Sequence, residues 1–167
     1  MPCIHQLPPL PLTNPFMMVQ KMSVAARRAV IVSTARTGLA KSFRGGFNMT
    51  HGAALAGHAI EHAVARAGLS GDSSIIDDVI LGCGMPEGET GMNVARNAAL
   101  WGGLPNTTSG STINRFCSSG LQGIVSAAHA ITVEGSQAAI GGGVDSISLV
   151  QPKLAKGVVV ERKLMKR

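Results

Sequence analysis

The stretch Asn114-Arg115-Phe116-Cys117-Ser118-Ser119-Gly120-Leu121-Gln122 places a cysteine at the start of a predicted helix. Downstream, apolar residues recur at helical spacing, at Leu121, Ile124, Val125, Ala128 and Ile131. Upstream, residues 107–113 are rich in Thr, Ser and Gly and predict a short strand or turn. Cys117 is therefore expected where backbone N–H groups are unpaired and the helix dipole is positive.

A cysteine in that position has two interpretations. The positive end of a helix stabilises a thiolate, which is the form of a thiol that attacks carbonyl carbon. A free cysteine is otherwise most often a small buried core residue. The sequence shows no histidine paired with Cys117, so the spacing alone leaves both interpretations open.

Strands and helices are predicted to alternate on both sides of this segment. The predicted elements are a buried strand at 29–33, a helix at 50–67 ending before Gly68, a strand at 76–81, a helix at 93–101, a helix at 118–133 stopping near Gly135, and a strand at 138–140. Such alternation is typical of an α/β fold, in which helices cover a mostly parallel sheet.

Four segments carry a more specific pattern in a fixed order. They are Arg28-Ala-Val-Ile-Val-Ser-Thr-Ala-Arg-Thr-Gly38, Gly82-Cys-Gly-Met-Pro-Glu-Gly-Glu-Thr-Gly-Met-Asn-Val-Ala-Arg96, the stretch around Cys117, and Gly141-Gly-Gly-Val-Asp-Ser-Ile-Ser148. Together they resemble the thiolases, the family of acetyl-CoA acetyltransferases and 3-ketoacyl-CoA thiolases. The resemblance implies a thiolase-like α/β fold, namely an incomplete first half of a layered α/β/α/β/α architecture.

The resemblance divides the chain into three parts. Residues 1–27 contain Leu7-Pro8-Pro9-Leu10-Pro11 and are expected to form an irregular leader. That segment lacks acids, so an organellar transit peptide stays open, although it is poor in Ser and Arg. Residues 28–151 are expected to be a partial thiolase N-terminal domain, and residues 152–167 a basic tail that the motifs do not match.

The resemblance also implies a function. Cys117 is expected to be the nucleophile that takes an acyl group from acyl-CoA, and its backbone N–H is expected to contribute to the oxyanion hole. The acyl-cysteine would then enter a Claisen condensation, or form during thiolysis of a 3-ketoacyl-CoA. Coenzyme A thioesters are the implied substrates, with no resident cofactor, and the residues that bind them are unknown. The implied partners are a second copy of the chain or a complementing second thiolase half.

The chain departs from the family pattern in its basic groups. Thiolases carry a partner histidine in a G-H-P motif, a second cysteine in a C-x-G-G-G motif, and an N-E-A-F-type segment, and these 167 residues contain none of them. The histidines are His5, His51, His58, His62 and His129. We therefore expect a chain that is incomplete and inactive alone. The alternative is a non-catalytic thiolase-like remnant or assembly partner.

Composition excludes several other classes. The net charge is +6, but the basic residues gather in residues 1–60 and 153–167, while residues 61–152 carry an excess of acids. A nucleic-acid-binding domain would carry a basic stripe with aromatics on its folded body, and none is predicted here. Three cysteines without C-x-x-C spacing argue against a disulfide framework, and no apolar run is long enough for a membrane span. A cytoplasmic location is expected.

Some remaining motifs receive structural interpretations. His58-Ala-Ile-Glu61-His62 matches the H-x-x-E-H zinc pattern, with Glu134 as a conceivable third ligand. We interpret the two histidines as solvent-facing or capped, and no metal site is predicted. Gly141-Gly142-Gly143 is expected to permit close backbone approach, and Trp101 is predicted to lie in the core.

Overall fold

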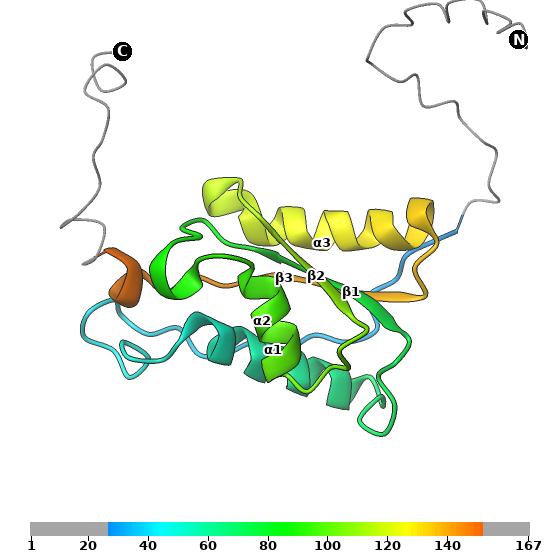
Figure 1. Cartoon of the computed structure of the whole chain (residues 1–167), viewed down its shortest axis with the longest axis horizontal. Helices are drawn as coiled ribbons and strands as arrows, with labels where there is room; N and C mark the ends of the chain where they lie inside the picture. Colours follow the sequence, from blue (N-terminus) through cyan, green and yellow to red (C-terminus); the bar gives the residue numbers. More distant parts are fainter. Residues whose placement is uncertain (1–26, 152–167) are drawn as a thin grey trace, which may run out of the picture.

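The computed structural model describes residues 27–151, which form a helix–sheet–helix sandwich (Figure 1). The predicted tail at 152–167, and all but the last residue of the predicted leader, lie outside the described residues. The main elements are α1 (Gly52–Arg66), β1 (Ile76–Gly82), α2 (Val94–Trp101), β2 (Ser109–Ile113), α3 (Ser119–His129) and β3 (Ala138–Gly143). Short helical turns are η1 (Gly88–Thr90), η2 (Phe116–Ser118) and η3 (Ala130–Glu134).

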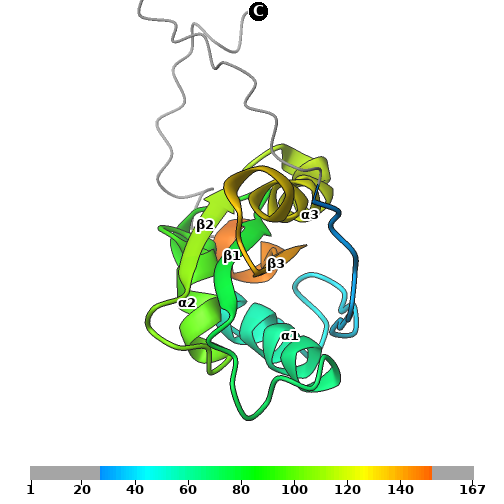
Figure 2. The same ribbon diagram turned by 90° about the vertical axis from the view of Figure 1, so that its right-hand side faces the viewer.

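The sheet is parallel, with strand order β2-β1-β3. Val79 of β1 lies opposite Gly110 of β2 and Ile140 of β3. Helix α3 covers one face of the sheet, and α1 and α2 cover the other (Figures 1 and 2). The predicted α/β class is confirmed. All three strands end at the same edge of the sheet, where α3 begins.

The capping residues of α1 explain where that helix starts and stops. The His51 side chain accepts a hydrogen bond from the Ala53 N–H at 3.2 Å, which satisfies one free donor of the first turn. At the other end Gly68 has a φ of +78°, a left-handed conformation that favours glycine. The predicted helix and its termination before Gly68 are confirmed.

The central strand β1 contributes to the core on both sides, because successive side chains in a strand point to opposite faces. Val79 and Leu81 belong to a cluster with Ile60 of α1. Ile80 points to the other face and packs with Ala127 and the neighbouring Ala130 below α3. Val79 has no exposed surface, so the centre of β1 lies at the middle of the fold.

Glycines allow α3 to lie unusually close to the sheet. A Cβ atom on Gly141 would lie 2.6 Å from the Ile124 Cα, and one on Gly143 would lie 2.9 Å from the Gly120 Cα. Real Cβ atoms essentially never come this close to backbone atoms. The prediction that this glycine run permits close backbone approach is confirmed.

The predicted buried strand at 29–33 is wrong. These residues have no regular secondary structure, and Val30, Ile31 and Val32 are 70%, 76% and 77% exposed. The segment is attached to α1 instead: the Ser33 hydroxyl donates to the Ala63 carbonyl at 2.8 Å. Among residues 27–151, no strand pairs with the outer edge of β3. Without a strand pairing at that edge, these β-branched side chains lack the cross-strand and same-face neighbours against which such residues pack.

Two side-chain environments also differ from expectation. Trp101 is 65% exposed and packs one side of its indole against Gly57, so the predicted core position is wrong. Leu121 of α3 is 67% exposed, and Ile124 and Val125 are also exposed. The helical spacing was right, but this apolar face points away from the sheet because Gly123 and Ala127 form the packed side.

Candidate functional site

Cys117 lies at the centre of η2, between the end of β2 and the first turn of α3. It is exposed, so the interpretation as a buried core cysteine does not hold for this structure. In parallel α/β sheets, ligands bind beyond the carboxyl ends of the strands. Cys117 follows β2 at that edge, Cys83 follows β1, and Asp145 follows β3.

Local hydrogen bonds fix the turn that carries Cys117. The Phe116 N–H donates to Asn114 Oδ1 at 2.7 Å, and the Arg115 N–H donates to Ser119 Oγ at 2.9 Å. The Ser119 hydroxyl in turn donates to the Phe116 carbonyl at 2.6 Å and is buried. Phe116 has a φ of +50°, which is uncommon for a residue other than glycine. The residues on both sides of Cys117 are therefore held by side chains of the same segment.

The electrostatic setting of Cys117 favours negative charge. The first turns of η2 and α3 contain no acidic residue. Ser118 makes no side-chain cap, and its N–H donates to the Arg115 carbonyl at 3.1 Å. The positive end of the helix dipole is thus directed at the segment that contains the exposed thiol. This arrangement can stabilise a thiolate or a developing oxyanion.

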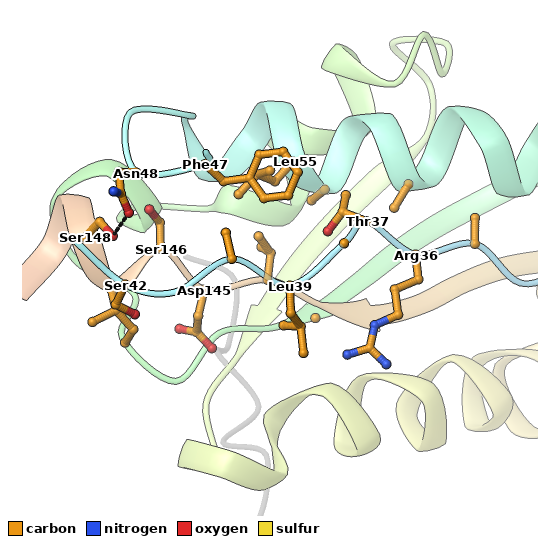
Figure 3. A pocket seen from close by; sticks show the side chains of 18 residues that line it. Arg36, Thr37, Leu39, Ser42, Phe47, Asn48, Leu55, Asp145, Ser146 and Ser148 are labelled. Atoms are coloured by element: carbon orange, nitrogen blue, oxygen red, sulfur yellow. Dashed lines mark hydrogen bonds between the residues drawn. The ribbon is translucent and has the colours of Figure 1, made fainter. Parts of the chain in front are cut away.

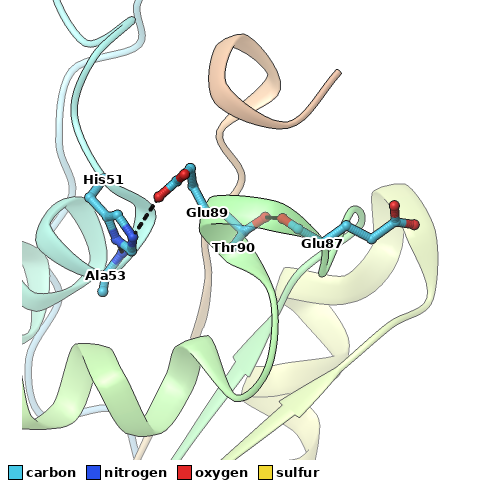
Figure 4. Close-up of polar contacts among 5 residues, drawn as sticks. All are labelled: His51, Ala53, Glu87, Glu89 and Thr90. Atoms are coloured by element: carbon cyan, nitrogen blue, oxygen red, sulfur yellow. Dashed lines mark hydrogen bonds and ion pairs between the residues drawn. The ribbon is translucent and has the colours of Figure 1, made fainter. Parts of the chain in front are cut away.

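Each histidine of residues 27–151 lies away from the thiol. His129 ends α3, about 18 Å along the helix from Cys117 at roughly 1.5 Å per residue. His58 and His62 lie on α1, across the sheet from α3 (Figure 2). His51, at the start of α1, pairs with Glu89 at 3.0 Å (Figure 4). The described residues thus bring no imidazole to Cys117.

Cys83 differs from Cys117 in both burial and charge environment. It has no exposed surface, and its thiol donates to Asp145 Oδ1 at 3.5 Å. Burial, with the neighbouring Asp145 carboxylate adding to it, raises the pKa of the Cys83 thiol to about 11. A buried thiol with a raised pKa forms little thiolate at neutral pH, so Cys83 is a poor candidate for a nucleophile.

A pocket of about 420 Å³ lies between residues 35–48, α1 and residues 143–148. Figure 3 shows Leu55 on the α1 side of this pocket and Asp145 on the opposite side. The Ser148 hydroxyl donates to Asn48 Oδ1 at 2.9 Å and joins the two walls. The pocket therefore begins beyond the end of β3 and shares Asp145 with the cluster around Cys83.

The H-x-x-E-H segment does not assemble a metal site. The rings of His58 and His62 meet edge to face with centroids 4.3 Å apart. Glu134 lies at the end of η3, which follows α3 on the other face of the sheet. Within residues 27–151, no group of three or more His, Cys, Asp or Glu side chains is placed to hold a metal ion.

Sequence reasoning missed two polar residues that organise this edge of the sheet. Asn114 belongs to the cysteine segment and Asp145 follows the glycine run, and the sequence pattern alone predicts no separate role for either. Asp145 accepts hydrogen bonds from the Gly84 N–H at 3.2 Å and the Met85 N–H at 3.0 Å. The sequence feature that could have identified Asp145 is its place as a carboxylate just after a predicted parallel strand.

No helix among the described residues is long and apolar enough to cross a membrane.

Comparison with known proteins gives concordant results. The thiolase N-terminal domain matches residues 29–166, which extends past Gln151, where the recognisable motifs end. The chain is 43% identical to a 3-ketoacyl-CoA thiolase of Bacillus subtilis (strain 168) over 124 residues, 74% of this chain and 31% of that protein. It is 38% identical to an acetyl-CoA acetyltransferase of Escherichia coli (strain K12) over 123 residues, 74% of this chain and 30% of that protein.

A shorter match is stronger in identity. Over 77 residues, 46% of this chain and 19% of the relative, the identity to the 3-oxoadipyl-CoA/3-oxo-5,6-dehydrosuberyl-CoA thiolase of Escherichia coli (strain K12) is 52%. The chain thus spans about a third or less of the length of these curated relatives.

Proposed function

Because the chain belongs to the thiolase family, with its N-terminal domain matching residues 29–166, we propose that it supplies the nucleophile of a thiolase-type acyltransferase. The described residues have part of the thiolase-like α/β fold. The observation that carries the proposal is the exposed Cys117 thiol at the start of α3, beyond the carboxyl ends of the parallel strands.

The proposed reaction uses coenzyme A thioesters as substrates and no resident cofactor. The Cys117 thiolate attacks the thioester carbonyl, a bond forms between sulfur and the acyl carbon, and coenzyme A leaves as the thiol. A second acyl-CoA, deprotonated to a carbanion, then displaces the cysteine in a Claisen condensation. Thiolysis of a 3-ketoacyl-CoA follows the same steps in reverse.

The oxyanion of each tetrahedral intermediate needs hydrogen-bond donors. The Cys117 N–H is proposed as one of them, because it lies at the positive end of α3 and no acid occupies the first turn. Carbanion formation also needs a base with its own oxyanion stabilisation. None of the described histidines lies beside Cys117, and the C-x-G-G-G motif of the family's second cysteine is absent from these 167 residues.

We therefore assign the base and the second cysteine to a complementing thiolase half, because a second copy of these 167 residues would lack the same motifs. Support comes from the missing G-H-P and C-x-G-G-G motifs and from the share of each relative that the chain spans. Alone, the chain is expected to be inactive. A cytoplasmic location agrees with the need for a reduced Cys117.

A second candidate is a non-catalytic assembly partner. The exposed apolar face of α3, with Leu121, Ile124 and Val125, favours it, because large exposed apolar patches mark association surfaces. Both candidate functions are compatible with association through this face of α3. They differ in whether Cys117 ever carries an acyl group.

The test mixes the full chain with acetyl-CoA and locates acetyl groups on cysteine-containing peptides by mass spectrometry. Slow acetylation of Cys117 is expected, absent in Cys117→Ala and retained in Cys83→Ala, without turnover. Co-expression with the remaining part of a related thiolase, which carries both missing motifs, is expected to give thiol release from acetoacetyl-CoA. If Cys117 stays unacylated with and without that complement, the assembly-partner function is the better account.

A further inference from the structure

Asp145 connects the ends of two strands at the edge of the sheet where Cys117 lies. Its carboxylate follows β3 and accepts from the Gly84 N–H at 3.2 Å and the Met85 N–H at 3.0 Å. It also accepts from the Cys83 thiol at 3.5 Å. All three donors belong to the loop that follows β1. A single carboxylate therefore fixes the start of that loop.

This loop contacts the segment that carries the nucleophile. The Gly84 carbonyl accepts from Asn114 Nδ2 at 3.3 Å, and Asn114 Oδ1 accepts from the Phe116 N–H at 2.7 Å. A Cβ on Gly84 would lie 3.4 Å from the Phe116 carbonyl oxygen and 3.5 Å from Asp145 Oδ2. Gly84 thus lies between the carboxylate and the residue that precedes Cys117.

The conformation that these contacts hold is not one that the chain adopts freely. Phe116 has a φ of +50°, and non-glycine residues with such values persist only where the surroundings fix them. The peptide between Phe116 and Cys117 contains the Cys117 N–H. The orientation of that peptide therefore decides where the N–H and the thiol point.

The geometry points to Asp145 as a positioning residue for Cys117. Asp145 acts through Gly84 and Asn114, which hold the Phe116 backbone. This inference rests on the proposed function, because it assumes that Cys117 is the reactive group. The hydrogen bonds of the Asp145 carboxylate go to Cys83, Gly84 and Met85, so its effect on Cys117 is indirect. The positioning requires the carboxylate, since one oxygen accepts from each of two successive N–H groups.

The chain offers a matched control at the opposite end of the same sheet. Asp77 Oδ2 accepts from the Gln137 N–H at 2.7 Å, which joins the start of β1 to the approach to β3. Asp77→Asn and Asp145→Asn each weaken one link between the same two strands. Only Asp145 is connected to the segment around Cys117. A purely structural role would therefore give the two variants similar properties.

The experiment measures alkylation of Cys117 by iodoacetamide in the full chain, followed peptide by peptide with mass spectrometry over a range of pH. For Asp145→Asn we expect a fall in the rate at neutral pH of about tenfold and a higher midpoint of the pH profile. Asp145→Glu is expected to restore most of the rate. Asp77→Asn is expected to match the unaltered chain in both rate and midpoint.

The sign of the effect separates positioning from charge. Removing a negative charge near a thiol favours the thiolate, so a simple Coulomb effect would raise the rate of Asp145→Asn. A raised or unchanged rate, or an equal fall in Asp77→Asn, overturns the inference. If Asp145→Asn does not fold, Asn114→Ala removes the second link, and an unchanged rate in that variant overturns the inference equally.

The outcome is distinguishable from failure of the proposed function. Iodoacetamide needs no coenzyme A, so the rate in the unaltered chain is compared with that of free glutathione in the same buffer. A Cys117 slower than glutathione argues against the proposed nucleophile itself. A fast Cys117 that is indifferent to Asp145 overturns only the positioning role.

Discussion

The position that a Cβ atom would take on Gly123 of α3 lies 2.5 Å from the Gly142 carbonyl oxygen of β3. The next nearest atom is the Ile80 carbonyl oxygen of β1, at 2.8 Å. Both obstacles are backbone atoms, which cannot swing aside as a flexible side chain can. Gly123 therefore sets the distance between α3 and the strands β1 and β3 below it.

Gly123→Ala is expected to lower the free energy of unfolding by about 1–3 kcal/mol, because α3 has to move off the sheet. Urea denaturation followed by circular dichroism measures it. Gly120→Ala is the control in the same helix: the nearest atoms to its Cβ are 3.9 Å away, in Gly143. That variant should keep or slightly raise stability, since alanine favours helix over glycine. Equal losses in both variants would contradict the account.

Stability should fall in alkaline solution because of Cys83. Burial and Asp145 raise the pKa of its thiol from 9.0 to about 11 in the folded chain. The unfolded chain thus releases this proton first, so the contribution is complete below about pH 9 and is lost as pH rises toward 11. Between about pH 8 and about pH 10 the loss should be on the order of 1 kcal/mol.

Urea denaturation at several pH values checks this dependence against Cys83→Ala. The variant is expected to be less stable at neutral pH. Its free energy of unfolding should also fall less steeply with pH in alkaline solution, because the Cys83 contribution is gone. Slopes, rather than absolute stabilities, are compared, because removing a buried thiol also leaves a small cavity. An identical slope in both chains would mean that Cys83 does not titrate differently on folding.

The sequence predicted element type well where the signal was local. The Ala-rich composition of α1 and the Gly68 that follows it predict this helix, and the segment around Cys117 predicts the start of α3. The strand predicted at 29–33 is wrong because Val30 and Ile31 are exposed, and a local pattern cannot show whether a segment finds a sheet edge and packing neighbours. Trp101 was misplaced for a related reason: its size indicates burial, but the Gly57 surface accepts only one side of it.

For the candidate site, the sequence indicated that Cys117 lies at the start of a helix, but not the contacts around it. Periodicity identified α3 but not which side of it packs on the sheet, because glycines such as Gly123 give no hydrophobic signal. The link from Asp145 to Gly84 joins residues far apart in sequence, and it follows from parallel strand order rather than from a motif. Such a contact becomes visible only when the strands are placed side by side.

The start of α1 should depend on His51. Its Nδ1 accepts from the Ala53 N–H at 3.2 Å, while Nε2 lies 3.0 Å from Glu89 Oε2 (Figure 4). His51→Ala is expected to cost about 1 kcal/mol of unfolding free energy, the usual value for a lost N-cap. His51→Asn keeps a capping acceptor and should recover most of it. The measurement is urea denaturation, and a full loss in both variants would assign the effect to Glu89 instead.

The exposed apolar face of α3 should control self-association. Leu121, Ile124 and Val125 are exposed on one side of the helix, and such contiguous patches drive association. The unaltered chain is expected to be oligomeric or poorly soluble by light scattering. A Leu121→Glu/Ile124→Lys double variant should shift it toward monomer without lowering stability by more than about 0.5 kcal/mol, because neither side chain is part of the buried core.

The control for that variant changes charge elsewhere. Glu61 and His62 are exposed on α1, on the opposite face of the sheet, so Glu61→Lys/His62→Glu introduces the same two charged residue types away from α3. That variant should leave the association unchanged. A monomeric unaltered chain, or equal dispersal by both double variants, would show that the α3 face is not an association surface. If the unaltered chain is monomeric, the assembly-partner function proposed from this face would lose its physical basis.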